Sequence, residues 1–475
     1  MKIKSNLSLA IVVLLLATVG IGIAYAGAYD TSFTTSITYQ NIGSSSTTGL
    51  SVDFYDSPTD TTPINVVLSN LGPGASSSVF VGSLGSISPG FQGTAILKSD
   101  QPMLATLVQV PQGSTTVIVR PLSNGFGGGG STALIATILK NTFGSTSILS
   151  VQNTDSEQND IVVDFYNTSA ALVDTVTMNN VEAGAGFYID AGLQSGLGTS
   201  FNGSAVITAE RNDNSAGNVI GSVMELDITG VGGKAFESVA AGSTTFYMPS
   251  ALCDVFGGQS TAYAVQNTSL SMSTDVTVTY SNGTTDLKTI GAGSKQSFQA
   301  CDVLSSGFSG SAIVTSSAQA VIAVGKAFGA GLSTAFLGAS SGAEVIGLPY
   351  VRWTSTTNYN NGSQQRVFLA IQNVGGSTVT GVTVAYIAAD GSTDGTHLLA
   401  PILAGAKANS NAGDAGLTEF GNPNAQPGYG GGVIITGPSG SQLVVIARVQ
   451  TCVGASGGTC FSAAAEDYNG VEIPD

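Results

Sequence analysis

The sequence predicts an all-β protein made of four tandem β-sandwich domains, and three observations support this prediction. A short strand that ends in Gln-Asn occurs four times at intervals of about one small domain. Between these copies, short runs rich in Val, Ile, Thr and aromatic residues alternate with turn residues. No repeat contains a long amphipathic helical pattern.

The Gln-Asn pairs are followed by other landmarks in a constant order. The glutamines are Gln40, Gln152, Gln266 and Gln372, which are 112, 114 and 106 residues apart. Next come an alternating strand (Val52-Asp53-Phe54 in the first copy), a glycine turn (Pro73-Gly74-Ala75) and an aromatic-x-Gly step (Phe91-Gln92-Gly93). In the fourth copy the last step matches only loosely, at Tyr429-Gly430-Gly431. About seven short, evenly spaced strands in a repeat predict an immunoglobulin-like or fibronectin-like sandwich.

The landmarks divide the chain into a leader and four domains. The expected boundaries are 1–26 for a signal peptide and 27–121, 131–240, 243–340 and 344–475 for the four β-sandwich repeats. The Gly-rich stretch from Pro121 to Ser131 has the composition of a flexible linker.

A strand followed by proline marks the repeat junctions. It occurs at Val117–Pro121, Phe246–Pro249 and Val345–Pro349, and again at the end of the chain at Gly470–Pro474. Two interpretations are open. Each domain ends in this strand, or the terminal strand pairs with the open sheet edge of another molecule.

The N-terminus carries a secretion signal. Lys2 and Lys4 precede an apolar stretch from Leu7 to Ala24, and Ala24-Tyr25-Ala26 fits the small-x-small rule for cleavage after Ala26. The apolar stretch is long for a signal peptide, so an uncleaved membrane anchor is the alternative. Beyond this segment no apolar run approaches the roughly 20 residues of a membrane span. We therefore expect a secreted protein at the cell surface or outside the cell.

Composition limits the chemistry. Only 9% of residues are charged, against about 25% in typical globular proteins. The formal charge of −16 argues against nucleic acid as a partner, because an acidic surface repels phosphates.

The four cysteines suit an oxidising compartment. The two pairings that we expect are Cys253–Cys301 and Cys452–Cys460, although four cysteines allow three connectivities. A metal site is disfavoured at the cysteines, because the chain has no CxxC and no histidine lies near them.

Candidate catalytic groups are few, and we expect no enzyme and no cofactor. The single histidine, His397, follows a loop that reads as a hairpin turn. Asp53 and Asp164 recur at one repeat position on the face expected to be solvated, which does not resemble two carboxylates across a cleft. Calcium is the one metal considered, with Asp155, Glu157 and Asp160 as candidate ligands, but their spacing matches no known calcium loop.

The ordered landmarks resemble a repeat of secreted, largely uncharacterised bacterial surface proteins built from tandem β-sandwiches. The resemblance rests on Gln-Asn, V-x-[FY], the glycine turn and F-x-G-[ST]-A, and it covers most of the chain after the leader. It implies extracellular placement and architecture, and transfers no active site.

The expected function is structural: a secreted rod of four sandwiches that forms part of a surface layer, matrix or filament. Its expected partners are other copies of itself or other surface proteins, and a membrane only through an uncleaved N-terminus. The alternative is an adhesin or carbohydrate-binding protein, with Tyr55, Tyr166, Trp353 and Tyr359 as stacking platforms for extracellular glycans. Five Asn-x-Ser/Thr sequons are possible glycosylation sites: Asn167, Asn202, Asn267, Asn282 and Asn361.

Overall fold

The structure is a computed structural model that describes residues 32–112, 119–227, 232–354, 363–421, 431–453 and 462–474. These residues form 32 strands and four short 3₁₀ helices, and this part of the chain contains no α-helix. The all-β prediction is confirmed. None of the helices in the described ranges is long and apolar enough to span a membrane.

The strands form eight antiparallel sheets, two for each copy of the Gln-Asn strand. We call the four chain segments repeats 1 to 4. The sheet that contains the Gln-Asn strand is the Gln-Asn sheet of its repeat, and the other is the companion sheet.

Repeats 1 and 2 consist of the following strands in sheet order. The Gln-Asn sheet of repeat 1 contains β4 (Ser76–Phe80), β1 (Phe33–Asn41), β6 (Met103–Pro111) and β7 (Leu122–Asn124). Its companion sheet contains β3 (Ile64–Val67), β2 (Ser51–Tyr55) and β5 (Thr94–Lys98). The Gln-Asn sheet of repeat 2 contains β12 (Gly186–Asp190), β9 (Ser145–Asn153), β14 (Val219–Asp227) and β15 (Gly233–Glu237). Its companion sheet contains β11 (Leu172–Val181), β10 (Asn159–Asn167), β13 (Phe201–Arg211) and β8 (Thr132–Lys140).

Repeats 3 and 4 have equivalent strand orders, with one additional strand at the end of the companion sheet of repeat 4. The Gln-Asn sheet of repeat 3 contains β20 (Lys295–Gln299), β17 (Ser260–Asn267), β22 (Val321–Gly329) and β23 (Leu332–Leu337). Its companion sheet contains β19 (Thr285–Ile290), β18 (Thr274–Tyr280), β21 (Phe308–Ser316) and β16 (Thr245–Cys253). The Gln-Asn sheet of repeat 4 contains β28 (Lys407–Ser410), β25 (Ser363–Asn373), β30 (Leu443–Val453) and β31 (Ser462–Asn469). Its companion sheet contains β27 (Thr393–Leu398), β26 (Thr383–Ala388), β29 (Gly431–Thr436), β24 (Val345–Leu348) and β32 (Val471–Glu472).

The 3₁₀ helices occupy one equivalent place in each repeat. Each follows the outermost strand of a Gln-Asn sheet, as η1 (Val81–Ser83), η2 (Ser195–Leu197), η3 (Ala300–Asp302) and η4 (Ala412–Ala415). The four repeats therefore share small irregular features as well as sheet order.

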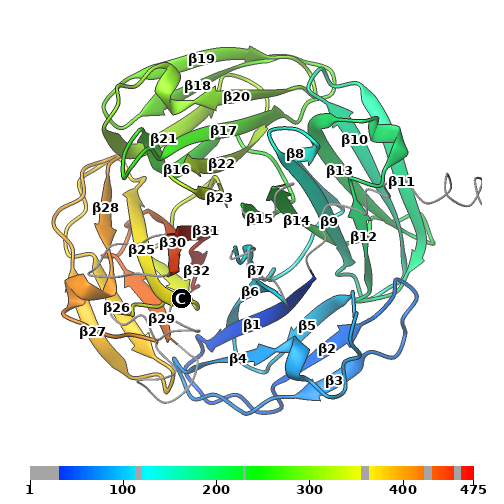
Figure 1. The fold of residues 1–475 in the computed structure, drawn as a ribbon, viewed down its shortest axis with the longest axis horizontal. Coiled ribbons are helices and arrows are strands. Elements are labelled where there is room, and N and C mark those ends of the chain that lie inside the picture. Colours follow the sequence, from blue (N-terminus) through cyan, green and yellow to red (C-terminus); the bar gives the residue numbers. More distant parts are fainter. Residues whose placement is uncertain are drawn as a thin grey trace, which may run out of the picture.

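The sheets stand around a central axis, with the strands of each sheet running in order from rim to centre (Figure 1). β7, β15, β23 and β31 lie nearest the axis and contact one another. Repeat 4 also packs against repeat 1, because Val108 and Leu122 belong to the hydrophobic cluster of repeat 4. The extended rod expected from the sequence is therefore wrong, and the chain closes into a ring. Blade-like sheets around an axis resemble a β-propeller, but here two sheets come from each repeat.

The strand order differs from the immunoglobulin arrangement. Counted along repeat 2, the second, fifth, seventh and eighth strands form one sheet, and the first, third, fourth and sixth form the other. In immunoglobulin sandwiches the last strand shares a sheet with the third and sixth strands. Here the last two strands, β14 and β15, form an antiparallel hairpin that keeps the last strand in the Gln-Asn sheet.

Four segments lie in places that the sequence did not predict. The stretch read as a flexible linker contains β7, whose Leu122 is buried at the axis. The strand-then-proline segments at Phe246 and Val345 are β16 and β24, which begin repeats 3 and 4. The terminal segment is β32, which pairs with β24 of its own chain at Ile346↔Glu472. It is thus a different element from the junction strands, and its edge pairing is made within its own chain.

The aromatic landmarks pack against each other in every repeat. The V-x-[FY] aromatic meets the aromatic of the later step edge to face, in the pairs Phe54–Phe91, Phe165–Phe201, Tyr280–Phe308 and Tyr386–Phe420, with ring centroids 5.5–6.5 Å apart. In repeat 4 this place belongs to Phe420, which corrects the loose match at Tyr429. Tyr429 itself lies outside the described residues.

Candidate functional site: the repeat seams, the axis and the exposed hairpins

The asparagine of each Gln-Asn pair fixes the turn that follows it. Asn153 is fully buried, and its Nδ2 donates to the carbonyl oxygens of Glu157, Val181 and Glu182. Its Oδ1 accepts from the backbone N–H of Asp155 at 2.8 Å. Asn41, Asn267 and Asn373 have the same kind of surroundings. Each asparagine therefore satisfies backbone groups inside its own repeat.

The glutamines and the F-x-G-[ST]-A residues meet at the seams between repeats. At the seam of repeats 1 and 2, the carbonyl oxygen of Gly184 accepts from Gln152 Nε2 and from Thr94 Oγ1, both at 2.9 Å. Gln152 also donates to the carbonyl of Ala95 at 3.4 Å. Gly184 has φ 81°, a conformation that glycine adopts without strain and that exposes its carbonyl to both donors.

The seam of repeats 3 and 4 uses the same residues. Gly405 O accepts from Gln372 Nε2 at 3.3 Å and from Ser311 Oγ at 2.7 Å. Gln372 donates in addition to Ala312 O at 3.4 Å. At these two seams the repeat motif therefore also joins neighbouring repeats.

The other two seams use different groups. Between repeats 2 and 3, the buried Lys295 replaces the small residue of the turn, and its Nζ donates to Gly203 O at 2.9 Å. Between repeats 4 and 1, Ser76 accepts from the N–H of Gly431 at 3.1 Å and donates its own N–H to Ala389 O at 3.0 Å. This last seam closes the ring.

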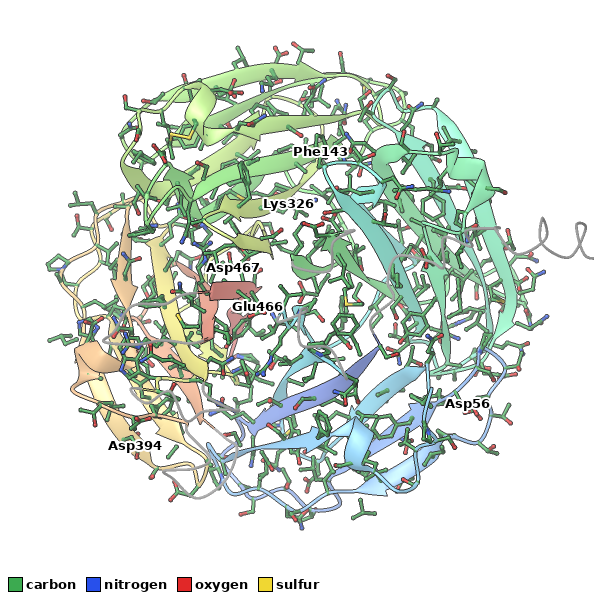
Figure 2. The ribbon with its side chains drawn as sticks, in the orientation of Figure 1. Asp56, Phe143, Lys326, Asp394, Glu466 and Asp467 are labelled. Carbon is green, nitrogen blue, oxygen red and sulfur yellow. A yellow bond between two sulfur atoms is a disulfide. The ribbon has the colours of Figure 1, made fainter. Side chains whose placement is uncertain are left out.

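Charged side chains lie near the axis, where Figure 2 places the buried Glu466 and Asp467 and the half-buried Lys326. Glu225 of β14 is fully buried between Lys326 Nζ at 2.8 Å and Lys234 Nζ at 3.2 Å. Burial would raise the pKa of Glu225, but the two ammonium groups outweigh it and lower that pKa overall. Burial lowers the pKa of Lys326 to about 8, so both partners are charged at neutral pH.

The innermost strands are joined by further polar contacts. Asp467 forms a bidentate pair with Arg448, with both N–O distances at 2.8–2.9 Å, and accepts from Thr334 Oγ1 at 2.7 Å. Asn469 donates to Leu337 O and accepts from Leu337 N–H, which ties β31 to β23. These contacts hold separate repeats together at the axis.

Two axial carboxyl groups accept hydrogen bonds from backbone N–H groups. Glu466 Oε1 accepts from the N–H of Arg120 at 2.6 Å, and Glu237 accepts from the N–H of Asn124. Burial raises the pKa of Glu237, and it raises the pKa of Glu466 to about 8. Glu466 is therefore mostly protonated at neutral pH.

Because the pKa of Glu466 is raised in the folded protein, the stability of the protein should depend on pH. A folded-state pKa above the ordinary value means that the unfolded state loses its proton first, so the contribution of Glu466 to stability falls from about pH 4.5 to about pH 8. We expect Glu466→Gln to reduce the slope of the unfolding free energy against pH by about 1 kcal/mol per pH unit in this window. Urea unfolding at several pH values measures it. An unchanged slope would show that Glu466 is ionised in the folded protein.

The calcium candidates do not converge on one point. Both carboxylate oxygens of Asp155 are held by Arg211, at 2.8 Å each, and one oxygen of Asp160 accepts from the N–H of Asn180. Glu157 is exposed. Within the described ranges no group of three or more His, Cys, Asp or Glu could hold a metal ion.

The candidate catalytic residues have structural contacts. His397 Nδ1 lies 2.9 Å from the Oγ of Ser410, and that buried hydroxyl also contacts the OH of Tyr386 at 3.0 Å. Asp53 is buried and paired with Lys98, so the expected solvated position is wrong for this residue. Asp164 accepts from Thr175 Oγ1.

The aromatic residues proposed as stacking platforms are not displayed together. Tyr55 is buried against repeat 2, and Tyr166 is half-buried. Trp353 is half-buried under the guanidinium of Arg366, 4.7 Å from the ring centroid. Tyr359 lies outside the described residues.

Two aromatics that the sequence patterns did not single out are strongly exposed. Phe143 and Phe256 lie in equivalent loops, β8–β9 and β16–β17, each of which connects the companion sheet to the Gln-Asn sheet of its repeat, and they are 80% and 67% exposed. Both have positive φ, 51° and 50°, which is uncommon for a bulky residue. The signal was the recurrence of Asn141-Thr142-Phe143-Gly144 as Asp254-Val255-Phe256-Gly257, in which the first residue also has positive φ.

The sequons differ in accessibility. Asn282 is exposed on a hairpin and Asn167 is half-buried. Asn267 is fully buried and committed to three carbonyl oxygens, so it is not available for glycosylation in the folded chain. Asn202 is half-buried, and Asn361 lies outside the described residues.

The Cys253–Cys301 disulfide is confirmed, and it links β16 to η3. Cys452 lies in β30, whereas Cys460 lies outside the described residues, so their pairing stays a prediction. We expect Cys253→Ser with Cys301→Ser to lower the unfolding free energy by about 2–4 kcal/mol, because the bond closes a loop over 48 residues. Chemical denaturation under oxidising conditions measures this. Addition of reductant should destabilise the variant less than the wild type.

No known family model matches the chain, and no curated protein matches it significantly.

Proposed function

We propose that the protein is a secreted, non-catalytic structural protein, built of four β-sandwich domains that follow a signal peptide. Its ring acts as a building block of a surface layer, matrix or filament. The recurring polar residues support this proposal, because they are used inside the molecule. The Gln-Asn, glycine-turn and Ser/Thr groups bond to backbone within and between repeats, and Glu225, Asp155 and Asp467 are each paired with cations.

The observation that carries the assembly function is the exposed phenylalanine in two equivalent loops. The two loops occupy equivalent places in successive repeats around the axis (Figure 1). A large apolar side chain held in a strained backbone conformation is costly, and such features cluster at interaction sites. Phe143 and Phe256 would serve as anchors in contacts between copies of the chain.

The test is self-association of the purified protein. We expect sedimentation velocity to show concentration-dependent association that is at least about tenfold weaker in a Phe143→Ser, Phe256→Ser variant. The control is Leu287→Ser, which is similarly exposed, at 63%, but lies on β19, the outermost strand of its companion sheet, and not in a phenylalanine loop. A wild-type protein that stays monomeric at every concentration would reject the assembly function.

The second candidate is an adhesin. Its contact residues would be Phe143 and Phe256, which are exposed, in place of the aromatics expected from the sequence. In that case the wild type would be monomeric and would bind a glycan or surface protein through these two loops. Binding on a glycan array that is lost in the double serine variant would favour the adhesin over the assembly function.

A further inference from the structure

One sheet lacks a strand that its three counterparts possess. In repeats 2, 3 and 4 the strand equivalent to β5 is paired on its axial side by β8, β16 and β24 respectively. β5 pairs with β2, and among the described residues no strand pairs with its other edge. An unpaired edge of this kind offers backbone N–H and C=O groups to an incoming strand.

The core beside this edge is also incompletely covered. Ala95 and Leu97 of β5 are half-buried, whereas the equivalent Ala205 and Ile207 of β13 are fully buried. The same two positions in repeat 3, Ala312 and Val314, are buried as well. The greater exposure of Ala95 and Leu97 than of the equivalent residues in repeats 2 and 3 indicates that a further strand would cover apolar surface of repeat 1.

The register identifies which segment would occupy the edge. β1 and β9 have equal length and start 112 residues apart, at Phe33 and Ser145, which is the spacing of their glutamines. The same shift places the equivalent of β8 at residues 20–28 and the equivalent of the loop between β8 and β9 at residues 29–32. Residues 20–28 read Gly-Ile-Gly-Ile-Ala-Tyr-Ala-Gly-Ala, with Ile21, Ile23 and Tyr25 in strand alternation.

The leader has the spare length that this requires. Its apolar stretch from Leu7 to Ala24 exceeds the 7–15 residues of an ordinary signal-peptide core. Thr18-Val19-Gly20 also fits the small-x-small rule, and cleavage there would leave an apolar core of ordinary length. Cleavage after Ala26 would instead remove most of the segment that the register assigns to the strand.

We infer that the leader is cleaved no later than Gly20, and that residues 20–28, or those of them that remain, pair antiparallel with β5 as the missing axial strand of repeat 1. The N-terminal segment thus completes the companion sheet next to the seam of repeats 1 and 2. This assignment rests on the proposed secretion but not on the proposed assembly, because the disulfide trap reports strand pairing whether or not copies of the chain associate.

The first test is the intact mass of the protein secreted by its own host. A mature chain that starts at or before Ile21 is expected. A chain that starts at Gly27 overturns the inference, because the strand would then be absent.

The second test is a disulfide trap in the full chain. The pair Ala205↔Ile135 in repeat 2 corresponds to Ala95 and Ile23 in repeat 1, and directly opposed residues in antiparallel strands are close enough to be bridged. Ile23→Cys with Ala95→Cys should form an intramolecular disulfide in most molecules. The control, Gly22→Cys with Ala95→Cys, is shifted by one residue and should form little. Absence of the bridge in the first variant, equal bridging in both, or a bridge between two chains would each overturn the inference, the last by assigning the edge to a second copy.

Discussion

Glu225→Gln is expected to lower the unfolding free energy by about 3–5 kcal/mol, among the largest effects of any single substitution in this chain. The change leaves Lys234 and Lys326 close together near the axis without a counter-charge. The loss should be smaller at pH 9 than at pH 7, because burial already lowers the pKa of Lys326 to about 8 and its neutral form needs no partner. Guanidinium unfolding at both pH values measures the effect.

The matched control for this prediction is Glu210→Gln on β13, where the glutamate side chain is exposed. We expect a change below about 0.5 kcal/mol there. Similar losses in both variants would mean that the axial ion pairs contribute no more than a surface charge.

Asn153→Ala is expected to cost at least about 3 kcal/mol, since it leaves several buried polar groups unpaired. The side chain makes five hydrogen bonds, to Glu157, Val181 and Glu182 through Nδ2, and from Asp155 N–H and Asn159 Nδ2 to Oδ1. Thermal and urea unfolding of the purified variant measure the loss.

The control is Asn212→Ala in the same repeat, whose exposed side chain makes one hydrogen bond, to Gln158. It should change stability by less than about 0.5 kcal/mol. If Asn153→Ala were equally mild, the conserved geometry of the four asparagines would have little energetic weight.

Much of the local structure could be predicted because it depends on local rules. Alternation predicted the strands, glycine predicted the turns with positive φ such as Gly184, and the landmark aromatics proved to be paired. The Cys253–Cys301 bond followed from the position of the cysteines in one repeat. The two loops that contain Phe143 and Phe256 have similar sequences, but the sequence does not show that these phenylalanines are exposed, so they were not predicted as a site.

The ring could not be predicted, since the sequence contains no information on which surfaces of the repeats meet. Thr94 and Ser311 occupy the same position of the repeat motif, but the motif does not indicate whether a side chain there faces solvent or a neighbouring glycine turn. Only the structure shows that both side chains form hydrogen bonds across a seam. Likewise, the short stretch at Leu122 reads as linker until the axis provides a buried place for it.

By itself the sequence determined that the chain is all-β and repeats one pattern of strands and turns, because side-chain alternation and turn residues act over a few neighbours. The tertiary structure alone decided that the repeats close on themselves and bury glutamate, aspartate and lysine at the centre. That outcome depends on contacts between residues more than a hundred positions apart, such as Lys326 with Glu225 and Glu466 with Arg120.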